Sequence, residues 1–145
     1  MPVETVARSL SFINWVVVTS LAAGSLAAIL VLTYRAESTR GYRGFTVFAA
    51  GGWAFLAWLA DGALPVPSAD APIQAASPEI DALRRLLLVS VATLATLWTV
   101  RIARGGDGRT VGLVTVGTAV AALLVAAVGW AESPLLAVAL ALQLL

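Results

Sequence analysis

The residues best suited to chemistry in this chain are two acids, Asp61 and Glu132, which end apolar stretches. Each comes shortly after a tryptophan, in Trp58-Leu-Ala-Asp61 and in Trp130-Ala-Glu132. Acids inside membrane segments are costly and often belong to ion or proton pathways. One hypothesis is therefore a transport site that uses Asp61 and Glu132. The favoured interpretation is that both acids lie at the membrane interface and anchor helix ends.

A second candidate is a row of three threonines, Thr93, Thr96 and Thr99, repeated every third residue. This spacing drifts slowly around a helix, so the three hydroxyls form one weakly polar stripe. A stripe of this kind can line a pore. Hydroxyls in membrane helices more often bond their own backbone or a neighbouring helix, and this packing role is favoured here.

The missing residue types narrow the chemistry further. The sequence has no Cys and no His, and Met1 is its only methionine. Haem, copper and iron–sulfur sites depend mainly on these side chains, as does nucleophilic catalysis by Cys or His. We therefore expect no enzyme activity, no catalytic residue and no metal or cofactor ligated by a side chain. Contact with a lipid, a quinone or a pigment stays open.

The composition indicates that the chain is surrounded by lipid and not by water. Hydrophobic residues make up 60% of the 145 residues, charged residues only 12%, and the mean hydropathy is +0.93. Soluble domains carry about 25% charged residues. A chain with so few charges cannot cover a soluble core, so the bilayer must surround it. Its nine basic residues are all arginines scattered over helix ends, and nucleic-acid binding is not expected.

Four apolar runs are predicted to span the membrane, at residues 12–34, 44–61, 84–104 and 111–131. The first has 23 residues, enough to cross a hydrocarbon core of about 30 Å. The prediction is an all-α bundle of four transmembrane helices, arranged as two helical hairpins, in one domain over residues 1–145. A proline-rich external loop, residues 62–83, separates the hairpins. Within it, Ser77-Pro78-Glu79 is typical of a helix start, so the third helix begins before the membrane.

Residues 134–145 form a half-length apolar tail, predicted to be a short helix. About 18 Å is the reach of twelve helical residues, roughly half of a bilayer. The tail has no polar face to suit a surface helix. A protein partner that covers it is the favoured explanation, and an interfacial segment is the alternative.

The distribution of arginines predicts the orientation. The hairpin loops, residues 35–43 and 101–110, contain Arg35, Arg40, Arg43, Arg101, Arg104 and Arg109. Only Arg8, Arg84 and Arg85 belong to the opposite side. Arginine-rich loops stay in the cytoplasm, so both hairpin loops are expected there and both termini outside, in a bacterial cytoplasmic membrane.

Aromatic residues suggest two interfacial belts. Trp15, Trp58 and Trp130 are expected near the outer membrane interface, and Trp98 near the inner interface. The matching order of span, arginine loop, span, aromatic and acid in the two halves also raises the hypothesis of a duplicated hairpin. The alternative is convergence, because any two hairpins that obey the same membrane rules look alike.

Small residues at four-residue spacing are dense in two spans and are predicted to pack helices. Such faces let backbones approach closely, and they are a main source of adhesion between membrane helices. Some of these faces are expected to dock onto other proteins. The predicted packing residues are Ser20, Gly24, Ala28, Gly117, Ala121, Ala122 and Ala126.

These observations lead to one expected function and one alternative. We expect a non-catalytic accessory or structural subunit of a multi-subunit membrane complex, most plausibly one of respiratory or photosynthetic electron transfer. Its partners would be other membrane subunits and lipids. The alternative is a small homo-oligomeric transporter or channel that uses Asp61 and Glu132.

Overall fold

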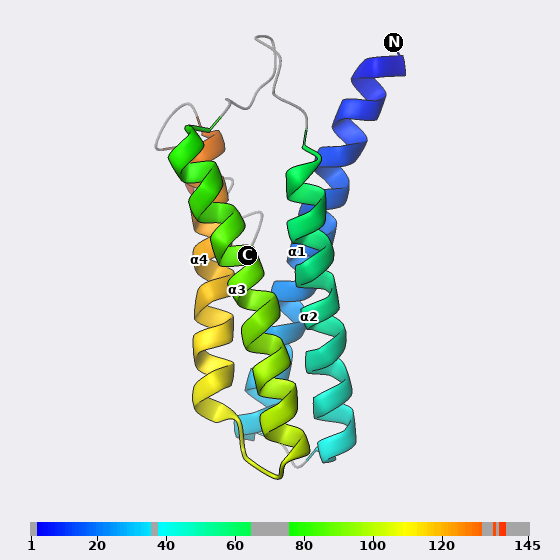
Figure 1. The fold of residues 1–145 in the computed structure, drawn as a ribbon, viewed down its shortest axis with the longest axis vertical. Coiled ribbons are helices and arrows are strands. Elements are labelled where there is room, and N and C mark those ends of the chain that lie inside the picture. The colour runs from blue at the N-terminus through cyan, green and yellow to red at the C-terminus, as the bar shows by residue number, and fades with distance from the viewer. Residues whose placement is uncertain (1–2, 36–37, 65–75, 132–134, 136, 139–145) are drawn as a thin grey trace.

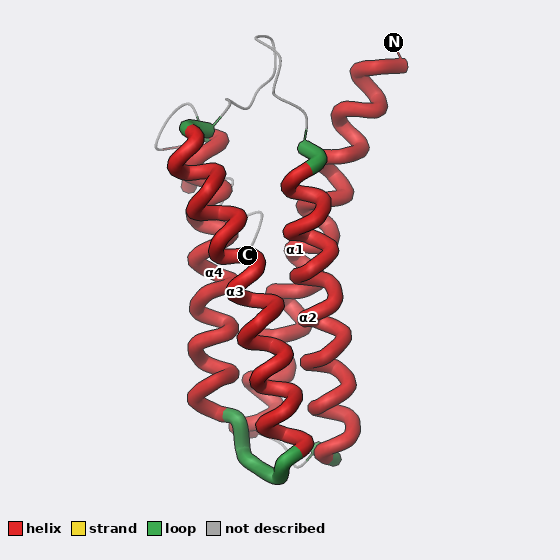
Figure 2. The backbone as a smooth tube through the Cα atoms, in the orientation of Figure 1, coloured by secondary structure: helices red, strands yellow, loops and turns green. Residues whose placement is uncertain are grey.

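The computed structural model describes residues 3–35, 38–64, 76–131, 135, 137 and 138, with side chains from residue 10 onward. The described residues form four helices and no strand (Figures 1 and 2). The helices are α1 (Val3–Arg35), α2 (Arg40–Gly62), α3 (Pro78–Ala103) and α4 (Arg109–Trp130). All four are long and apolar enough to cross a membrane. The predicted all-α bundle of four such helices is confirmed.

The helix boundaries follow local capping signals. Helix α3 begins at Pro78, where the Ser-Pro-Glu pattern predicts it, and the Ser77 hydroxyl accepts a hydrogen bond from the Ile80 amide. Helix α2 begins at Arg40, earlier than the predicted span, because Thr39 caps it in the same way. Helix α1 begins at Val3, also well before its predicted span. Most of the tail at residues 134–145 lies outside the described residues, as does loop segment 65–75.

The four helices run up and down as two hairpins (Figure 1). The α1–α2 and α3–α4 turns lie together at one end of the bundle, here named the loop end. The opposite end holds the last turn of α2 and the first turns of α3, and is named the connection end. Among the four neighbouring helix pairs, contact is most extensive between α2 and α3, and least extensive between α1 and α4. The two hairpins are therefore joined mainly through their α2–α3 face.

The buried residues recur at alternating spacings of three and four. In α3, for example, the buried positions step from Arg84 to Leu88, Val91, Ala95, Trp98 and Ile102. This repeat keeps one narrow stripe of each helix facing its neighbours, as in coiled coils. The other helices carry similar stripes, widened by the neighbouring buried residues Val18, Gly51, Leu123 and Ala127. The stripe residues are Trp15, Thr19, Ala22, Leu26, Ile29 and Thr33 in α1, Val47, Ala50, Ala54, Ala57 and Asp61 in α2, and Gly112, Thr115, Ala119, Ala122, Ala126 and Trp130 in α4.

Glycines make room for the closest contacts inside the bundle. A Cβ on Gly51 would lie 3.0 Å from the Cβ of Ala95, so α2 and α3 approach each other closely there. At the loop end, a Cβ on Gly112 would lie 2.7 Å from Cζ2 of Trp98. Gly108 has a φ of 66° and lies against the same ring, so these two glycines form the pocket for Trp98. The absence of side chains at these glycines leaves the space that the Trp98 ring fills.

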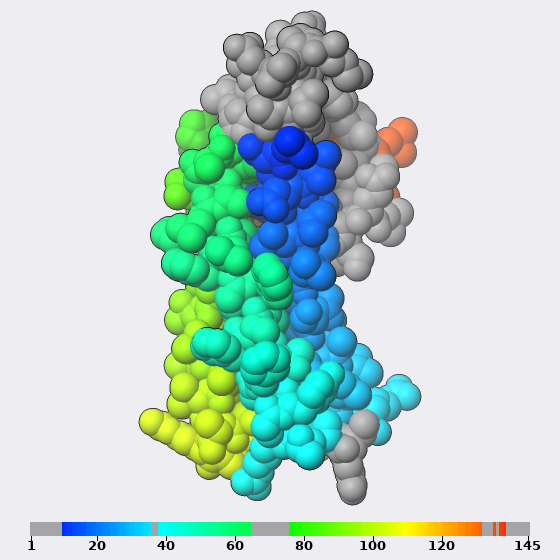
Figure 3. Space-filling view, turned by 90° about the vertical axis from the view of Figure 1, so that its right-hand side faces the viewer, coloured from blue at the N-terminus to red at the C-terminus, as the bar shows by residue number. Residues whose placement is uncertain are grey.

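The outer surface is apolar over most of the bundle length. Large side chains project from every helix, as the surface of α1 and α2 in Figure 3 illustrates. In a bilayer such side chains contact lipid tails, so their exposure carries no hydrophobic penalty. Phe45 and Phe48 of α2 are the most exposed aromatics, at 71% and 64%.

Three of the tryptophans assigned to interfacial belts instead belong to the bundle core. Trp15 and Trp98 are fully buried, and Trp130 is 4% exposed. These three rings face the bundle core and not the surrounding lipid, because each falls on the buried stripe of its helix. Trp58 is half-buried, and only this member of the predicted outer belt remains at the surface.

Candidate functional site

A buried ion pair joins the two hairpins at the connection end. Arg84 Nε donates a hydrogen bond of 2.6 Å to Asp61 Oδ1, and Arg84 Nη2 donates one of 3.3 Å to Oδ2. The side chain of Asp61 is fully buried and that of Arg84 is 4% exposed. A two-pronged arginine–carboxylate contact of this kind fixes both distance and orientation. It therefore sets the relative position of α2 and α3.

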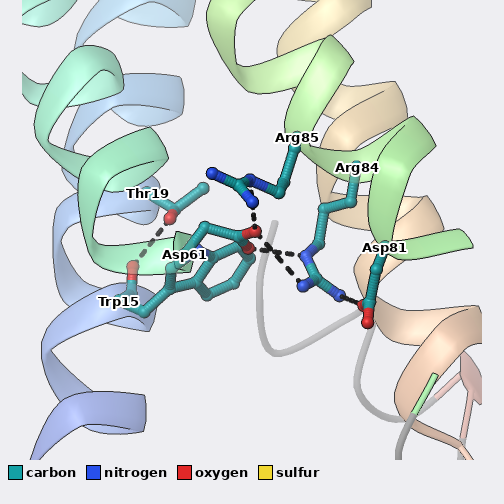
Figure 4. A network of polar contacts seen from close by, with 6 residues as sticks. All are labelled: Trp15, Thr19, Asp61, Asp81, Arg84 and Arg85. Carbon is teal, nitrogen blue, oxygen red and sulfur yellow. Dashed lines mark hydrogen bonds and ion pairs between the residues drawn. The ribbon is translucent and has the colours of Figure 1, made fainter. Parts of the chain in front are cut away.

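Two further charged groups flank the pair (Figure 4). Arg84 Nη1 lies 2.7 Å from Asp81 Oδ1, as an ion pair without hydrogen-bond alignment. Arg85 Nε lies 3.9 Å from Asp61 Oδ2. Both flanking side chains are about half exposed, at 44% for Asp81 and 49% for Arg85. Two acids and two arginines thus make a charge-neutral cluster whose centre is dry and whose rim reaches the surface.

Aromatic rings from α1 and α4 complete the cluster. The guanidinium of Arg84 lies 4.8 Å from the ring centroid of Trp130 in α4, within the range of a cation–π contact. Trp130 in turn packs edge-on against Trp15 and Phe12 of α1, with centroids 4.8 Å and 4.9 Å apart. All four helices therefore meet around one arginine.

Local sequence signals place these charges. The Ser77 cap and Pro78 start α3 where its first turns carry Asp81 and Arg84, and a separation of three residues puts those two on one helix face. Asp61, the other member of the pair, lies in the last turn of α2. The helix ends at the next residue, and the amides of Ala63 and Leu64 donate hydrogen bonds to carbonyls of that turn. The pair thus lies at the margin of the membrane segments.

The chemistry that this cluster can do is limited by its pairing. A guanidinium is a permanent cation with five donors and no acceptor, so it binds a carboxylate without exchanging a proton. A carboxylate in a transport site must be able to release its ion-pair partner and bind a proton or a cation instead. Both oxygens of Asp61 instead face arginine nitrogens, which suits a structural clamp between hairpins.

Of the two predicted transport acids, the structure describes only Asp61. Asp61 lies at a helix end as expected, but its side chain is buried and paired with Arg84 and is not an exposed anchor. Glu132 lies outside the described residues. Asp61 is buried because position 61 continues the buried stripe of α2, four residues after Ala57.

The predicted packing residues divide into three groups. Ala122 and Ala126 are buried inside the bundle, while Ser20 and Ala121 are half-buried. The outward-facing members are Gly24, Ala28 and Gly117. A Cβ placed on Gly24 or Gly117 would meet nothing within 4 Å. Within the bundle, the close approaches depend on Gly51, Gly108 and Gly112, which the four-residue spacing rule did not select.

The threonine stripe lies on the outside of α3. Thr93 and Thr96 are exposed and Thr99 is half-buried. Each hydroxyl donates to the carbonyl four residues earlier in its own helix, at 2.9 Å. Thr19 and Thr115, which face the core, do the same at 2.6 Å and 2.7 Å. The hydroxyls are therefore satisfied within their own helices, as the packing interpretation predicts.

The centre of the bundle is closed. Between the helices, a cavity of only about 10 Å³ is lined by residues of α1, α2, α3 and α4, among them Thr19, Ala54, Leu88 and Ala122. A buried water needs at least about 10–15 Å³ and two or more polar partners. The mostly apolar lining of this cavity does not supply them.

Sequence periodicity contained the signal for the buried pair. Leu88, Val91 and Ala95 mark one stripe of α3, and stepping back four residues from Leu88 reaches Arg84. The same step forward from Ala57 in α2 reaches Asp61. Two opposite charges at matching ends of two stripes are candidates for a pair, although only the structure shows that the two stripes face each other. The candidate pair was missed because Asp61 was assigned to the interface and Arg84 was counted only for the orientation.

Comparisons with known proteins add no relative. No family model, curated protein or solved structure matches this chain.

Proposed function

We propose that this chain is a non-catalytic accessory subunit of a larger membrane complex, and that it contributes helices that pack against other subunits. The observation that carries the proposal is the open space at Gly24 on α1 and at Gly117 on α4. In a bilayer, helices associate where small residues let backbones approach. These two positions offer that surface outside the bundle, while other glycines serve the inside.

The use of polar groups in the bundle supports the same role. Asp61 is paired with Arg84, the central cavity is smaller than a binding site, and the threonine hydroxyls bond their own helices. A subunit that seals or spaces its neighbours needs a rigid body with apolar outer faces. A respiratory or photosynthetic electron-transfer complex in a bacterial cytoplasmic membrane is the host that we favour, by analogy with small ligand-free subunits of such assemblies.

The experiment is purification of the tagged chain in mild detergent, followed by native electrophoresis and mass spectrometry. We expect a foreign membrane subunit in fixed stoichiometry. Gly24→Leu or Gly117→Leu should release it, because a large side chain prevents close helix approach. Gly52→Leu is the matched control, since Gly52 is an exposed α2 glycine whose Cβ also meets nothing within 4 Å.

Two outcomes would contradict this proposal. One is a wild-type chain that runs alone or as a homo-oligomer. The other is a foreign subunit that all three leucine variants retain equally, which would mean that neither glycine face is the contact.

The second candidate is a homo-oligomeric transporter or channel, favoured by the exposed stripe of Thr93 and Thr96 on α3. Because the centre of one bundle is closed, a path of this kind would have to lie between copies. Flux in proteoliposomes should then fall in a Thr93→Val/Thr96→Val variant. Flux that is unchanged in that variant, and unchanged again in Asp61→Asn with Glu132→Gln, would remove every site proposed for it.

A further inference from the structure

A groove at the loop end combines an apolar floor with two arginines. It measures about 450 Å³ and runs between α3 and α4, lined by Leu97, Val100, Arg101, Arg104, Gly106 and Val111. Leu97 is 54% exposed and Val100 is 40% exposed, so the apolar part is open to its surroundings. Arg101 and Arg104 follow at the end of the helix, and both are exposed. Along the bundle axis, the groove therefore changes from apolar to cationic.

The cations of the groove are not neutralised. Among the described residues, neither Arg101 nor Arg104 has an ion-pair partner, unlike Arg109, which lies 3.9 Å from Asp107 and 5.3 Å from the ring centroid of Tyr34. The sequence places six arginines at this end, against Glu37 and Asp107 as the acids of the two hairpin loops. The loop end thus carries a strong excess of positive charge.

The loop between α3 and α4 shapes the cationic end of the groove. The amide of Gly106 bonds to the carbonyl of Arg101 at 2.9 Å, and a Cβ on Gly106 would lie 3.8 Å from Cδ and Nε of Arg101. The turn therefore folds back on the Arg101 side chain. From α2, the guanidinium of Arg40 reaches the same turn, since a Cβ on Gly105 would lie 3.3 Å from its Nη1.

We propose that this groove is a binding site for one anionic phospholipid. The phosphate would sit between Arg101 and Arg104, with Arg40 nearby, and an acyl chain would follow Leu97 and Val100 into the membrane segment. The order of charge and apolar surface matches that of a lipid molecule standing in its leaflet. Basic pockets between membrane helices bind anionic headgroups in this manner, and guanidinium groups suit phosphate oxygens.

The test is native mass spectrometry of the full chain in detergent, titrated with phosphatidylglycerol and with phosphatidylcholine of the same acyl chains. We expect phosphatidylglycerol to bind at least about tenfold more tightly. Arg101→Gln/Arg104→Gln should weaken phosphatidylglycerol about 25-fold, at roughly fivefold per arginine, and leave phosphatidylcholine unchanged. Val100→Trp, which fills the apolar floor, should weaken both lipids.

Arg109→Gln is the matched control, because Arg109 lies at the same end but is already engaged by Asp107 and Tyr34. It should bind phosphatidylglycerol within about twofold of wild type. Helical content by circular dichroism checks that every variant is folded, which is expected because Arg101 and Arg104 are exposed. Millimolar inorganic phosphate is added as a competitor to separate a lipid site from a free-anion site.

Four results would overturn the proposal. Equal binding of the two lipids would remove the headgroup preference. If Arg109→Gln weakened phosphatidylglycerol binding as much as the double variant does, the attraction would come from the overall charge of the loop end and not from this groove. Full displacement by phosphate would indicate an anion site without a lipid, and occupation of the groove by a second protein chain in the native extract would indicate a protein interface.

Discussion

At the connection end Arg84 is buried against Asp61 and Trp130, whereas at the loop end Arg101 and Arg104 are exposed. Each end also buries a tryptophan, but by different means. Trp130 packs against the Arg84 guanidinium and edge-on against other rings, while Trp98 sits in a pocket formed by glycines. The contrast teaches that the connection end is held by specific polar contacts and the loop end by shape.

The largest expected effect comes from breaking the connection end. Asp61→Ala leaves the buried guanidinium of Arg84 without its buried counter-ion, with only the half-exposed Asp81 beside it, and this should cost about 3–5 kcal/mol in the free energy of unfolding. Unfolding in mixed micelles with increasing dodecyl sulfate, followed by circular dichroism, measures it. Asp107→Ala, at an exposed acid of the loop end, is the control and should change little.

A double variant sharpens the interpretation of the pair. Replacing the two charges together, as Asp61→Leu/Arg84→Met, should recover most of the stability, because the desolvation cost disappears along with the attraction. A double variant as unstable as Asp61→Ala would show instead that the pair itself contributes net stability.

The next largest effect should come from filling the glycine pocket of the loop end. Gly112→Ala places a Cβ 2.7 Å from the Trp98 ring, and such overpacking should destabilise by about 1–3 kcal/mol. The same unfolding assay applies, with Trp fluorescence as a second signal. Gly117→Ala, where the Cβ meets nothing within 4 Å, should stay within about 1 kcal/mol of wild type. Equal losses in both variants would refute the shape-based account.

The helix caps provide a smaller comparison between the ends. Ser77 caps α3 beside the charged cluster and Thr39 caps α2 at the loop end, each through a 3.4 Å bond. Replacement by alanine should cost about 0.5–1 kcal/mol at either site. We expect Ser77→Ala to be the more harmful, since it also loosens the turn that carries Asp81. A greater loss for Thr39→Ala in chemical unfolding would count against that coupling.

The smallest effect is expected at the exposed arginines. Arg101→Gln and Arg104→Gln should each change the free energy of unfolding in lipid-free detergent by less than about 0.5 kcal/mol, since neither side chain is buried or paired among the described residues. A loss above 1 kcal/mol would show that these side chains support the fold, and the contrast between the two ends would then disappear.

The interior contacts were only partly predictable. Periodicity and residue size correctly indicate Ala122 and Ala126 as packing positions. The same spacing also selects Gly24 and Gly117, which face outward, because a pattern within one helix does not say which face its neighbours cover. The burial of Trp15 and Trp98 was missed for the same reason, since each lies near a span end and also on a buried stripe.

By itself the sequence determined four helices, their approximate limits and their pairing into hairpins. The physical reason is that a backbone surrounded by lipid must satisfy its hydrogen bonds internally, so long apolar runs have one structure available. Only the tertiary structure decided which face of each helix is buried, and hence that Asp61 meets Arg84, 23 residues away. That meeting depends on the rotation and height of α2 against α3, which are set by packing between the helices.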